Sequence, residues 1–260
     1  TDAGPVTAVS APTDISGCVG WWDADDAGTL TLDGSGNVEE WADKSGQGND
    51  LLQATPANRP AVTAAALNGK PVVTFDGTND SLRTASFTLD QPFEYIMVFR
   101  MESAYVAGTF NRIIDAGSQP SPGRAGEVWH NGVNDIRTYA GSTIVGNEVP
   151  AGQLQQYNIW SFAFNGASGR IRYNAGEYEV VGNSGSGNGS RITLGADSNT
   201  TASSFSNISV AEIIVYDAAL SVADRARVEK YLQEKYALAA VHAPATATSD
   251  PVGYWGDKSG

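Results

Sequence analysis

The stretch Tyr157-Asn158-Ile159-Trp160-Ser161-Phe162-Ala163-Phe164 indicates the fold class, because its aromatic side chains recur at every second position. This spacing places the three rings on one face of a β-strand. Residues 94–101 are apolar on both faces, as is typical of a central strand that is covered on each side. The two stretches predict a protein built around buried β-sheet.

Shorter stretches of the same kind follow one another along the chain, separated by turns rich in glycine. Residues 169–173 and 177–181 flank Asn174-Ala175-Gly176 and predict a hairpin. The pattern predicts an all-β fold of two antiparallel sheets packed face to face. The other expected strands are residues 19–23, 38–41, 71–75, 191–195 and 210–216.

One segment, residues 221–238, has the spacing of a helix instead. Ser221 and Asp224 have the spacing of a capping box, in which the first residue caps the helix. We expect the apolar face of this helix to pack onto the outside of one sheet. That face comprises Val228, Tyr231, Leu232 and Tyr236.

The chain divides into three parts: residues 1–16 as an N-terminal extension, residues 17–238 as one domain, and residues 239–260 as an extended tail. The tail is rich in Ala, Thr and Pro over residues 243–251, which favours an extended path, and then becomes apolar. We expect residues 242–260 to dock on their own domain or on a neighbouring copy. Docking on a neighbour would give a homo-oligomer or attach the chain to a particle.

The charge balance restricts the partners. The 260 residues include 29 acidic and 16 basic ones, for a net charge of −13, which repels phosphate backbones and argues against nucleic acid. No apolar stretch is long enough to span a membrane, so we expect no membrane contact. The single cysteine, Cys18, stands in an apolar stretch and is expected to be buried and inert.

Several motifs together resemble a known family. Val19-Gly20-Trp21-Trp22-Asp23 is followed by Trp41-Ala42-Asp43-Lys44-Ser45-Gly46 and later by Glu212-Ile213-Ile214-Val215-Tyr216-Asp217 before the helix. This order is similar to laminin G-like domains of the concanavalin A-like lectin and glucanase superfamily. The resemblance implies a jelly-roll sandwich of the type found in bacterial surface proteins and bacteriophage virions. It also implies glycan or protein recognition, adhesion, or particle decoration.

Catalytic patterns are weak. Glu177-Tyr178-Glu179 lacks the third carboxylate of the related glucanases, and His130 and His242 are far apart in the sequence. We therefore expect no enzyme, but a non-catalytic binding or structural module on an extracellular or virion surface. The alternative is a carbohydrate-active enzyme of the same fold, either a glycoside hydrolase or a polysaccharide lyase.

Two acidic turns could hold a metal ion. Oxygen-rich loops suit Ca²⁺, so calcium is the one cofactor that we consider. Asp and Asn also build turns through hydrogen bonds to the backbone, and this alternative stays open. The candidate ligands are Asp23, Asp25 and Asp26 in one turn and Asp76, Asn79 and Asp80 in the other.

A third pattern suggests a glycan site on a hairpin. Sugar rings stack on aromatic side chains while their hydroxyls bond to amides and carboxylates, and residues 129–139 offer this mixture. The alternative is that Trp129 and Tyr139 belong to the core of the sandwich. The candidate ligand-binding residues are Trp129, His130, Asn131, Asn134, Asp135 and Tyr139.

Overall fold

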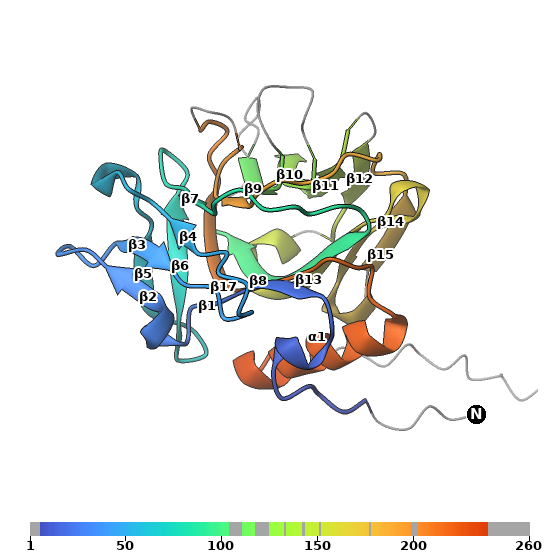
Figure 1. The fold of residues 1–260 in the computed structure, drawn as a ribbon, viewed down its shortest axis with the longest axis horizontal. Coiled ribbons are helices and arrows are strands. Elements are labelled where there is room, and N and C mark those ends of the chain that lie inside the picture. Colours follow the sequence, from blue (N-terminus) through green and yellow to red (C-terminus); the bar gives the residue numbers. More distant parts are fainter. Residues whose placement is uncertain are drawn as a thin grey trace, which may run out of the picture.

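The computed structural model describes residues 6–103, 111–117, 125–132, 134–141, 144–150, 152–176, 178–198 and 202–238. Two antiparallel sheets face each other, and a long helix at residues 222–236 lies outside one of them (Figure 1). The predicted all-β jelly-roll sandwich with a C-terminal helix is confirmed. The tail, residues 239–260, lies outside the described residues, and its docking stays a prediction.

The first sheet has eight strands in the order β15-β14-β13-β8-β17-β6-β5, with β1 paired to β17. The long strand β17 lies beside β8 over its length, while β6 and β1 share its other edge. The strands are β1 (Cys18–Asp23), β5 (Ala61–Leu67), β6 (Lys70–Asp76), β8 (Phe93–Met101), β13 (Asn158–Phe164), β14 (Gly169–Tyr173), β15 (Tyr178–Gly182) and β17 (Asn207–Tyr216).

The second sheet has nine strands in the order β12-β11-β10-β9-β16-β7-β4-β3-β2. Its strands are β2 (Leu30–Leu32), β3 (Val38–Trp41), β4 (Leu51–Leu52), β7 (Leu82–Arg83), β9 (Asn111–Asp115), β10 (Glu127–Gly132), β11 (Asp135–Tyr139), β12 (Ile144–Glu148) and β16 (Thr193–Leu194). Short 3-10 helices are η1 (Pro12–Asp14), η2 (Ala27–Thr29), η3 (Pro56–Asn58), η4 (Gln153–Gln155), η5 (Gly166–Ser168) and η6 (Asn174–Gly176).

The space between the sheets is filled by aromatic side chains. Trp160, Phe162 and Phe164 of β13 all point into this main core, as the alternation of their sequence predicts. The Trp160 and Phe162 rings stack with centroids 5.9 Å apart, and Phe164 stacks on Phe93 of β8 at 4.8 Å. Rings of this size contribute much of the apolar area that stabilises the sandwich.

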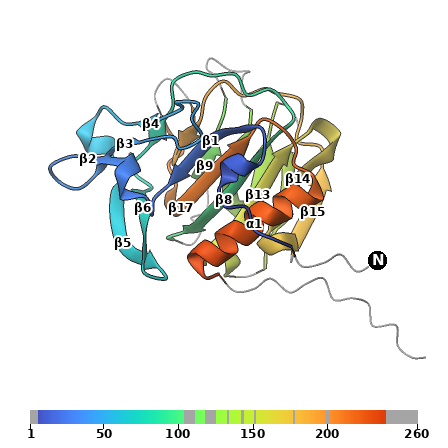
Figure 2. The same cartoon turned by 60° about the horizontal axis from the view of Figure 1, so that its bottom comes forward.

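A second core lies between the first sheet and α1 (Val222–Tyr236), which crosses the face of that sheet in Figure 2. Val228 and Leu232 are fully buried there, which confirms the predicted helix face. Ser221 caps the helix by accepting a hydrogen bond from the Asp224 amide at 3.0 Å. Trp21 belongs to this second core and Trp22 to the main one, because successive residues of β1 face opposite sides.

The described part of the predicted N-terminal extension packs against the domain. Val9 and Ile15 are buried in the second core, and the Tyr216 hydroxyl donates to the Pro12 carbonyl at 2.9 Å. Cys18 is buried, as predicted. Burial, and to a lesser extent the negative charge of Asp43, raises the pKa of its thiol to about 12. Such a thiol stays protonated and inert at neutral pH.

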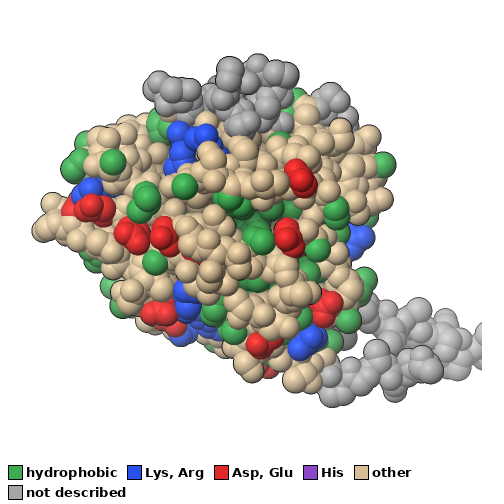
Figure 3. All heavy atoms as spheres, in the orientation of Figure 1, with side chains coloured by type: hydrophobic (Ala, Val, Ile, Leu, Met, Phe, Trp, Pro, Cys, Tyr) green, Lys and Arg blue, Asp and Glu red, His purple; other side chains and the backbone are tan. Residues whose placement is uncertain are grey.

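The described helices include none long and apolar enough to span a membrane. On the coloured surface in Figure 3, acidic side chains are scattered and basic ones form small groups. The expectation that nucleic acid is not a partner stays a prediction.

Candidate functional site

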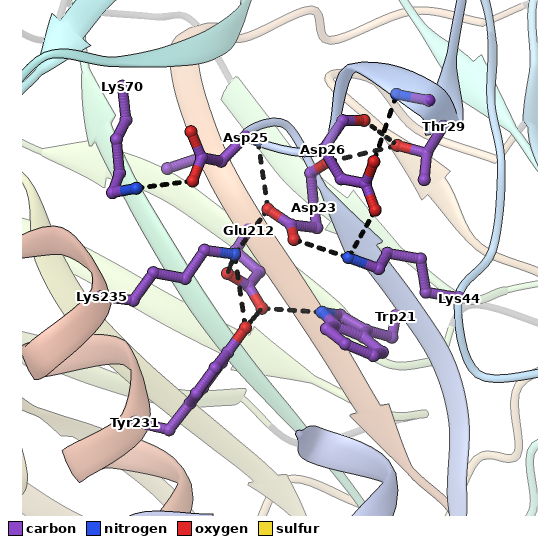
Figure 4. Close-up of polar contacts among 12 residues, drawn as sticks. Trp21, Asp23, Asp25, Asp26, Thr29, Lys44, Lys70, Glu212, Tyr231 and Lys235 are labelled. Carbon is purple, nitrogen blue, oxygen red and sulfur yellow. Dashed lines mark hydrogen bonds and ion pairs between the residues drawn. The ribbon is translucent and has the colours of Figure 1, made fainter. Parts of the chain in front are cut away.

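The first predicted calcium turn is held together by lysines (Figure 4). Lys44 Nζ lies 2.8 Å from an oxygen of Asp23 and 2.8 Å from one of Asp26, and Lys70 Nζ lies 2.6 Å from Asp25. Ammonium groups therefore stand where a cation would bind these carboxylates. Among the described residues, no group of three or more His, Cys, Asp or Glu side chains is arranged to hold a metal.

These lysines belong to a larger arrangement, the Glu212 cluster, centred on a carboxylate that is fully buried on β17. Glu212 accepts hydrogen bonds from Trp21 Nε1 at 2.7 Å, the Tyr231 hydroxyl at 3.0 Å and Lys235 Nζ at 2.7 Å. Burial raises the pKa of Glu212, while Lys235 opposes that rise. The cluster comprises Trp21, Asp23, Asp25, Asp26, Lys44, Lys70, Glu212, Tyr231, Lys235 and Tyr236, and joins α1 to β1 and β17.

The second predicted calcium turn has the hydrogen bonds of an ordinary acidic turn. Asp76 Oδ1 accepts from the Thr78 amide at 2.7 Å and the Asn79 amide at 3.2 Å, and Asp80 accepts from the Asp76 amide at 3.0 Å. Burial is the main cause that raises the pKa of Asp80 to about 6. Turn chemistry is therefore present at both turns, and calcium binding stays a prediction.

The predicted glycan hairpin is formed by β10 and β11. Trp129 pairs directly with Arg137, and Glu127 pairs with Tyr139, so these four side chains lie on one face of the hairpin. Val128, between them on β10, points the other way into the main core. The face with Trp129 is therefore the outer face of the second sheet.

Strand β9 extends this face. Arg112 pairs with Trp129, and its Nε lies 3.3 Å from the Glu127 carboxylate. The guanidinium carbons of Arg112 and Arg137 lie 5.9 and 5.5 Å from the centroid of the Trp129 ring, close enough for cation–π attraction. We define the β9–β11 face as Arg112, Asp115, Glu127, Trp129, Asp135, Arg137 and Tyr139.

Asp115 lies at the end of β9 and is only 2% exposed. It accepts hydrogen bonds from the Gly117 amide at 2.7 Å and the Ser198 amide at 2.9 Å. Burial and then the charge of Glu127 raise the pKa of Asp115 to about 7. Two carboxylates with different surroundings thus lie side by side, because Glu127 also has the Arg112 guanidinium as a partner.

The accessible part of the face lies along β11. Arg137 donates from Nε to both oxygens of Asp135, at 3.0 and 2.8 Å, and its side chain is 34% exposed. Tyr139 is half-buried on the same strand, whereas Trp129 of β10 is 6% exposed. The face therefore presents paired donors and acceptors to solvent, with the indole behind them.

Of the candidate ligand-binding residues, the structure places Trp129, Asp135 and Tyr139 on one face of the hairpin and His130 on the other. His130 is fully buried and pairs with the core residue Ile136, because it alternates with Trp129 along β10. It cannot join a ligand site on the outer face.

Two further candidates lie in or beside the hairpin turn. The Asn134 carbonyl accepts from the Val149 amide at 2.6 Å, and its side chain is partly exposed. The side chain of Asn131 lies outside the described residues.

Sequence reasoning missed three residues of this face: Arg112, Asp115 and Glu127. Charges that flank the apolar pair Ile113-Ile114 were the available signal for β9, but only the pairing with β10 shows that they meet Trp129. The acidic pair that the sequence did suggest is elsewhere: Glu179 Oε2 lies 2.9 Å from Arg172 on β14, and Glu177 lies outside the described residues.

Comparison with known proteins shows the fold but no family. No family model and no curated protein sequence matches the chain. The sialidase of Trypanosoma rangeli, solved with sialic acid, has a TM-score of 0.58 and 13% identity, over 90% of this chain and 36% of the sialidase. The binding domain of botulinum neurotoxin DC, solved with SialylT, has a TM-score of 0.58 and 10% identity, over 86% and 53%.

The botulinum neurotoxin type G receptor-binding domain is also similar, with a TM-score of 0.54 and 11% identity over 84% of this chain and 52% of that domain. The chain thus spans just over a third of the sialidase and about half of the toxin domains. At these identities the likeness shows the shared β-sandwich alone. It does correct one prediction: the expectation that this chain is not an enzyme is contradicted, because sialidases are among the proteins with this fold.

Proposed function

We propose that the chain binds carbohydrate through the β9–β11 face. The observation that carries this proposal is the alignment of Arg112, Trp129 and Arg137 across three neighbouring strands. Each guanidinium also has a carboxylate partner, Glu127 for Arg112 and Asp135 for Arg137. An oriented set of charged donors and acceptors on a rigid sheet is the kind of surface that recognises hydroxyl groups.

Sugar hydroxyls both donate and accept hydrogen bonds, so they suit a surface that offers both. The Arg137 guanidinium supplies donors, the Asp135 carboxylate supplies acceptors, and the Tyr139 hydroxyl supplies either. Hydrogen bonds to ionised groups are stronger than those between neutral ones. The half-buried position of these three residues on β11 makes them the first contacts for a ligand.

The neighbours in fold support the same class of ligand, since SialylT, bound in the toxin domain, and sialic acid, bound in the sialidase, are both carbohydrate. The laminin G-like resemblance of the sequence supports it as well. We include in the proposal an exterior location, either extracellular or on a virion, where glycans are met. Protein recognition or particle decoration through residues 242–260 remains part of this proposal.

The test compares two partly exposed arginines, each paired with an aspartate, one on the β9–β11 face and one on α1. Arg137→Ala removes a guanidinium that is 34% exposed and paired with Asp135, while Arg227→Ala removes one that is 42% exposed and paired with Asp224 on α1. Wild-type protein should bind members of a glycan array, and Arg137→Ala should weaken titrated affinity at least about tenfold. Equal loss in Arg227→Ala, or binding unchanged in Arg137→Ala, would contradict the proposal.

A second candidate function is glycoside hydrolysis, which the carboxylates of Asp115 and Glu127 favour. Such hydrolysis uses one protonated and one ionised carboxyl group. Burial raises the pKa of Asp115 to about 7, and Glu127 has the Arg112 guanidinium as its partner. If the pair is catalytic, Glu127→Gln should lower the release of reducing ends from an oligosaccharide panel at least about a hundredfold. Glu179→Gln removes a carboxylate on the first sheet instead, and this control variant should retain activity.

A further inference from the structure

We propose that the β9–β11 face selects uncharged saccharides over acidic ones. This inference rests on the proposed function and names the ligand class for the same face. It runs against the simplest expectation from the fold, since the sialidase is solved with sialic acid, an acidic sugar. The charges of the face itself, rather than the fold, carry the argument.

The most accessible cation is already neutralised by its neighbour. Arg137 donates from Nε to both carboxylate oxygens of Asp135, at 3.0 and 2.8 Å. The two residues are two positions apart on β11, so the strand itself holds them together. A ligand carboxylate would have to compete with Asp135 for this guanidinium, whereas a hydroxyl can bond to the pair as it stands.

The second cation is neutralised as well, and more deeply. Arg112 is 7% exposed, and its Nε lies 3.3 Å from Glu127, which is 1% exposed. Separating a buried ion pair leaves a charge without its partner, at a cost that a single new ion pair with a ligand does not recover. The Arg112 guanidinium therefore supports the Trp129 ring and Glu127 instead of receiving an anion.

The cations of the face are thus balanced by carboxylates. The guanidiniums of Arg112 and Arg137 are matched by the carboxylates of Glu127 and Asp135, and the charge of Arg83 on β7 interacts with that of Asp115. The whole chain, this face included, has a net charge of −13, so the long-range field also opposes an anionic ligand.

Pairs of sugars in which one member is uncharged and the other carries carboxylates test this selection. Isothermal titration would compare lactose with 3′-sialyllactose, and the methyl ester of tetragalacturonic acid with the free acid. Wild-type protein should bind the uncharged member of a pair at least about tenfold more tightly. The preference should narrow as salt is added, because screening weakens the repulsion of the acidic member.

Asp135→Asn removes one carboxylate and releases Arg137, so it should gain affinity for the acidic member of each pair. Asp224→Asn, which releases Arg227 on α1, is the matched control and should leave the preference unchanged. Equal or tighter binding of the acidic members by wild type would overturn the selection while leaving carbohydrate binding intact. Absence of binding to every sugar on the array and in both pairs would contradict the proposed function itself.

Discussion

Two groups of buried charges lie on opposite sides of the sandwich. The Glu212 cluster lies on the outer side of the first sheet, and the β9–β11 face lies on the outer side of the second. In the cluster, Glu212 receives donors from β1 and from α1, so three elements close around one carboxylate. On the β9–β11 face, by contrast, the charged side chains project from neighbouring strands of one sheet and meet each other side by side.

This difference separates a structural role from a binding role. Removing a member of the Glu212 cluster should loosen the contact between helix and sheet, since the partners come from separate parts of the chain. Arg137 and Asp135 sit on one strand whose backbone pairing with β10 and β12 does not depend on them. We therefore expect the cluster to determine stability and the face to determine ligand binding.

The largest effect should come from Glu212→Ala. The substitution takes the acceptor from Trp21 Nε1 and the Tyr231 hydroxyl and leaves the Lys235 ammonium with one buried partner fewer. Breaking a buried network of this kind costs about 3–5 kcal/mol of unfolding free energy. Urea denaturation followed by tryptophan fluorescence would measure the loss.

Arg137→Ala is the matched comparison from the other side, and its unfolding free energy should fall by less than about 1 kcal/mol because the pair is partly exposed. The proposed separation of roles would be wrong if Arg137→Ala proved as destabilising as Glu212→Ala.

A nearly equal effect is expected where apolar packing holds the same helix. Leu232 is fully buried in the second core, so Leu232→Ala should cost about 2–5 kcal/mol of unfolding free energy. Val222, on the same helix, is 72% exposed, and Val222→Ala should change stability by less than about 0.5 kcal/mol. If Leu232→Ala lowered the unfolding free energy by less than about 0.5 kcal/mol, the packing of α1 in solution would not depend on this contact.

The β9–β11 face should make the stability of the protein depend on pH. The pKa of Asp115 is raised from 3.8 to about 7, so the folded state binds a proton more tightly than the unfolded state does. The contribution of Asp115 to the free energy of unfolding is fully present below about pH 4 and is lost as the pH rises through 7. We expect the titration of Asp115 to lower the free energy of unfolding by about 2–4 kcal/mol between pH 4 and pH 8.

Asp115→Asn is the test, because an amide does not titrate. The drop in unfolding free energy between pH 4 and pH 8 should be smaller in this variant than in wild type. Asp224→Asn, at an exposed pair on α1, should leave the wild-type slope in place. An Asp115→Asn slope equal to that of wild type would mean that Asp115 titrates normally.

The two regions also differ in what the sequence alone could predict. Alternation along Asn158–Phe164 and the helical spacing after Ser221 depend on neighbours within one segment, and both are confirmed to within a residue or two. Strand β9 is short and flanked by residues without a clear pattern, and it was not predicted. Local patterns fix the elements, since burial of one face leaves a regular trace.

Contacts between distant segments leave no such trace. Asp23 and Lys235 are far apart in the sequence but lie 2.6 Å apart, so the acidic turn suggested calcium where the structure has lysine. His130 was included in the glycan hairpin by its position, but only the register of β10 shows that it faces the core. Predicting either would have required the pairing of strands.

The smallest effect concerns calcium at the Glu212 cluster. Lys44 bridges Asp23 and Asp26 at 2.8 Å each, so a calcium ion would have to displace a bound ammonium group. Millimolar Ca²⁺ should therefore stabilise wild-type protein by less than about 0.5 kcal/mol relative to chelator. Lys44→Met keeps the apolar stem over the Trp21 ring but removes the charge, and its melting temperature should rise more with Ca²⁺. Strong stabilisation of wild type by Ca²⁺ would instead place an ion at one of the two acidic turns, and Asp76→Asn and Asp25→Asn would then distinguish them.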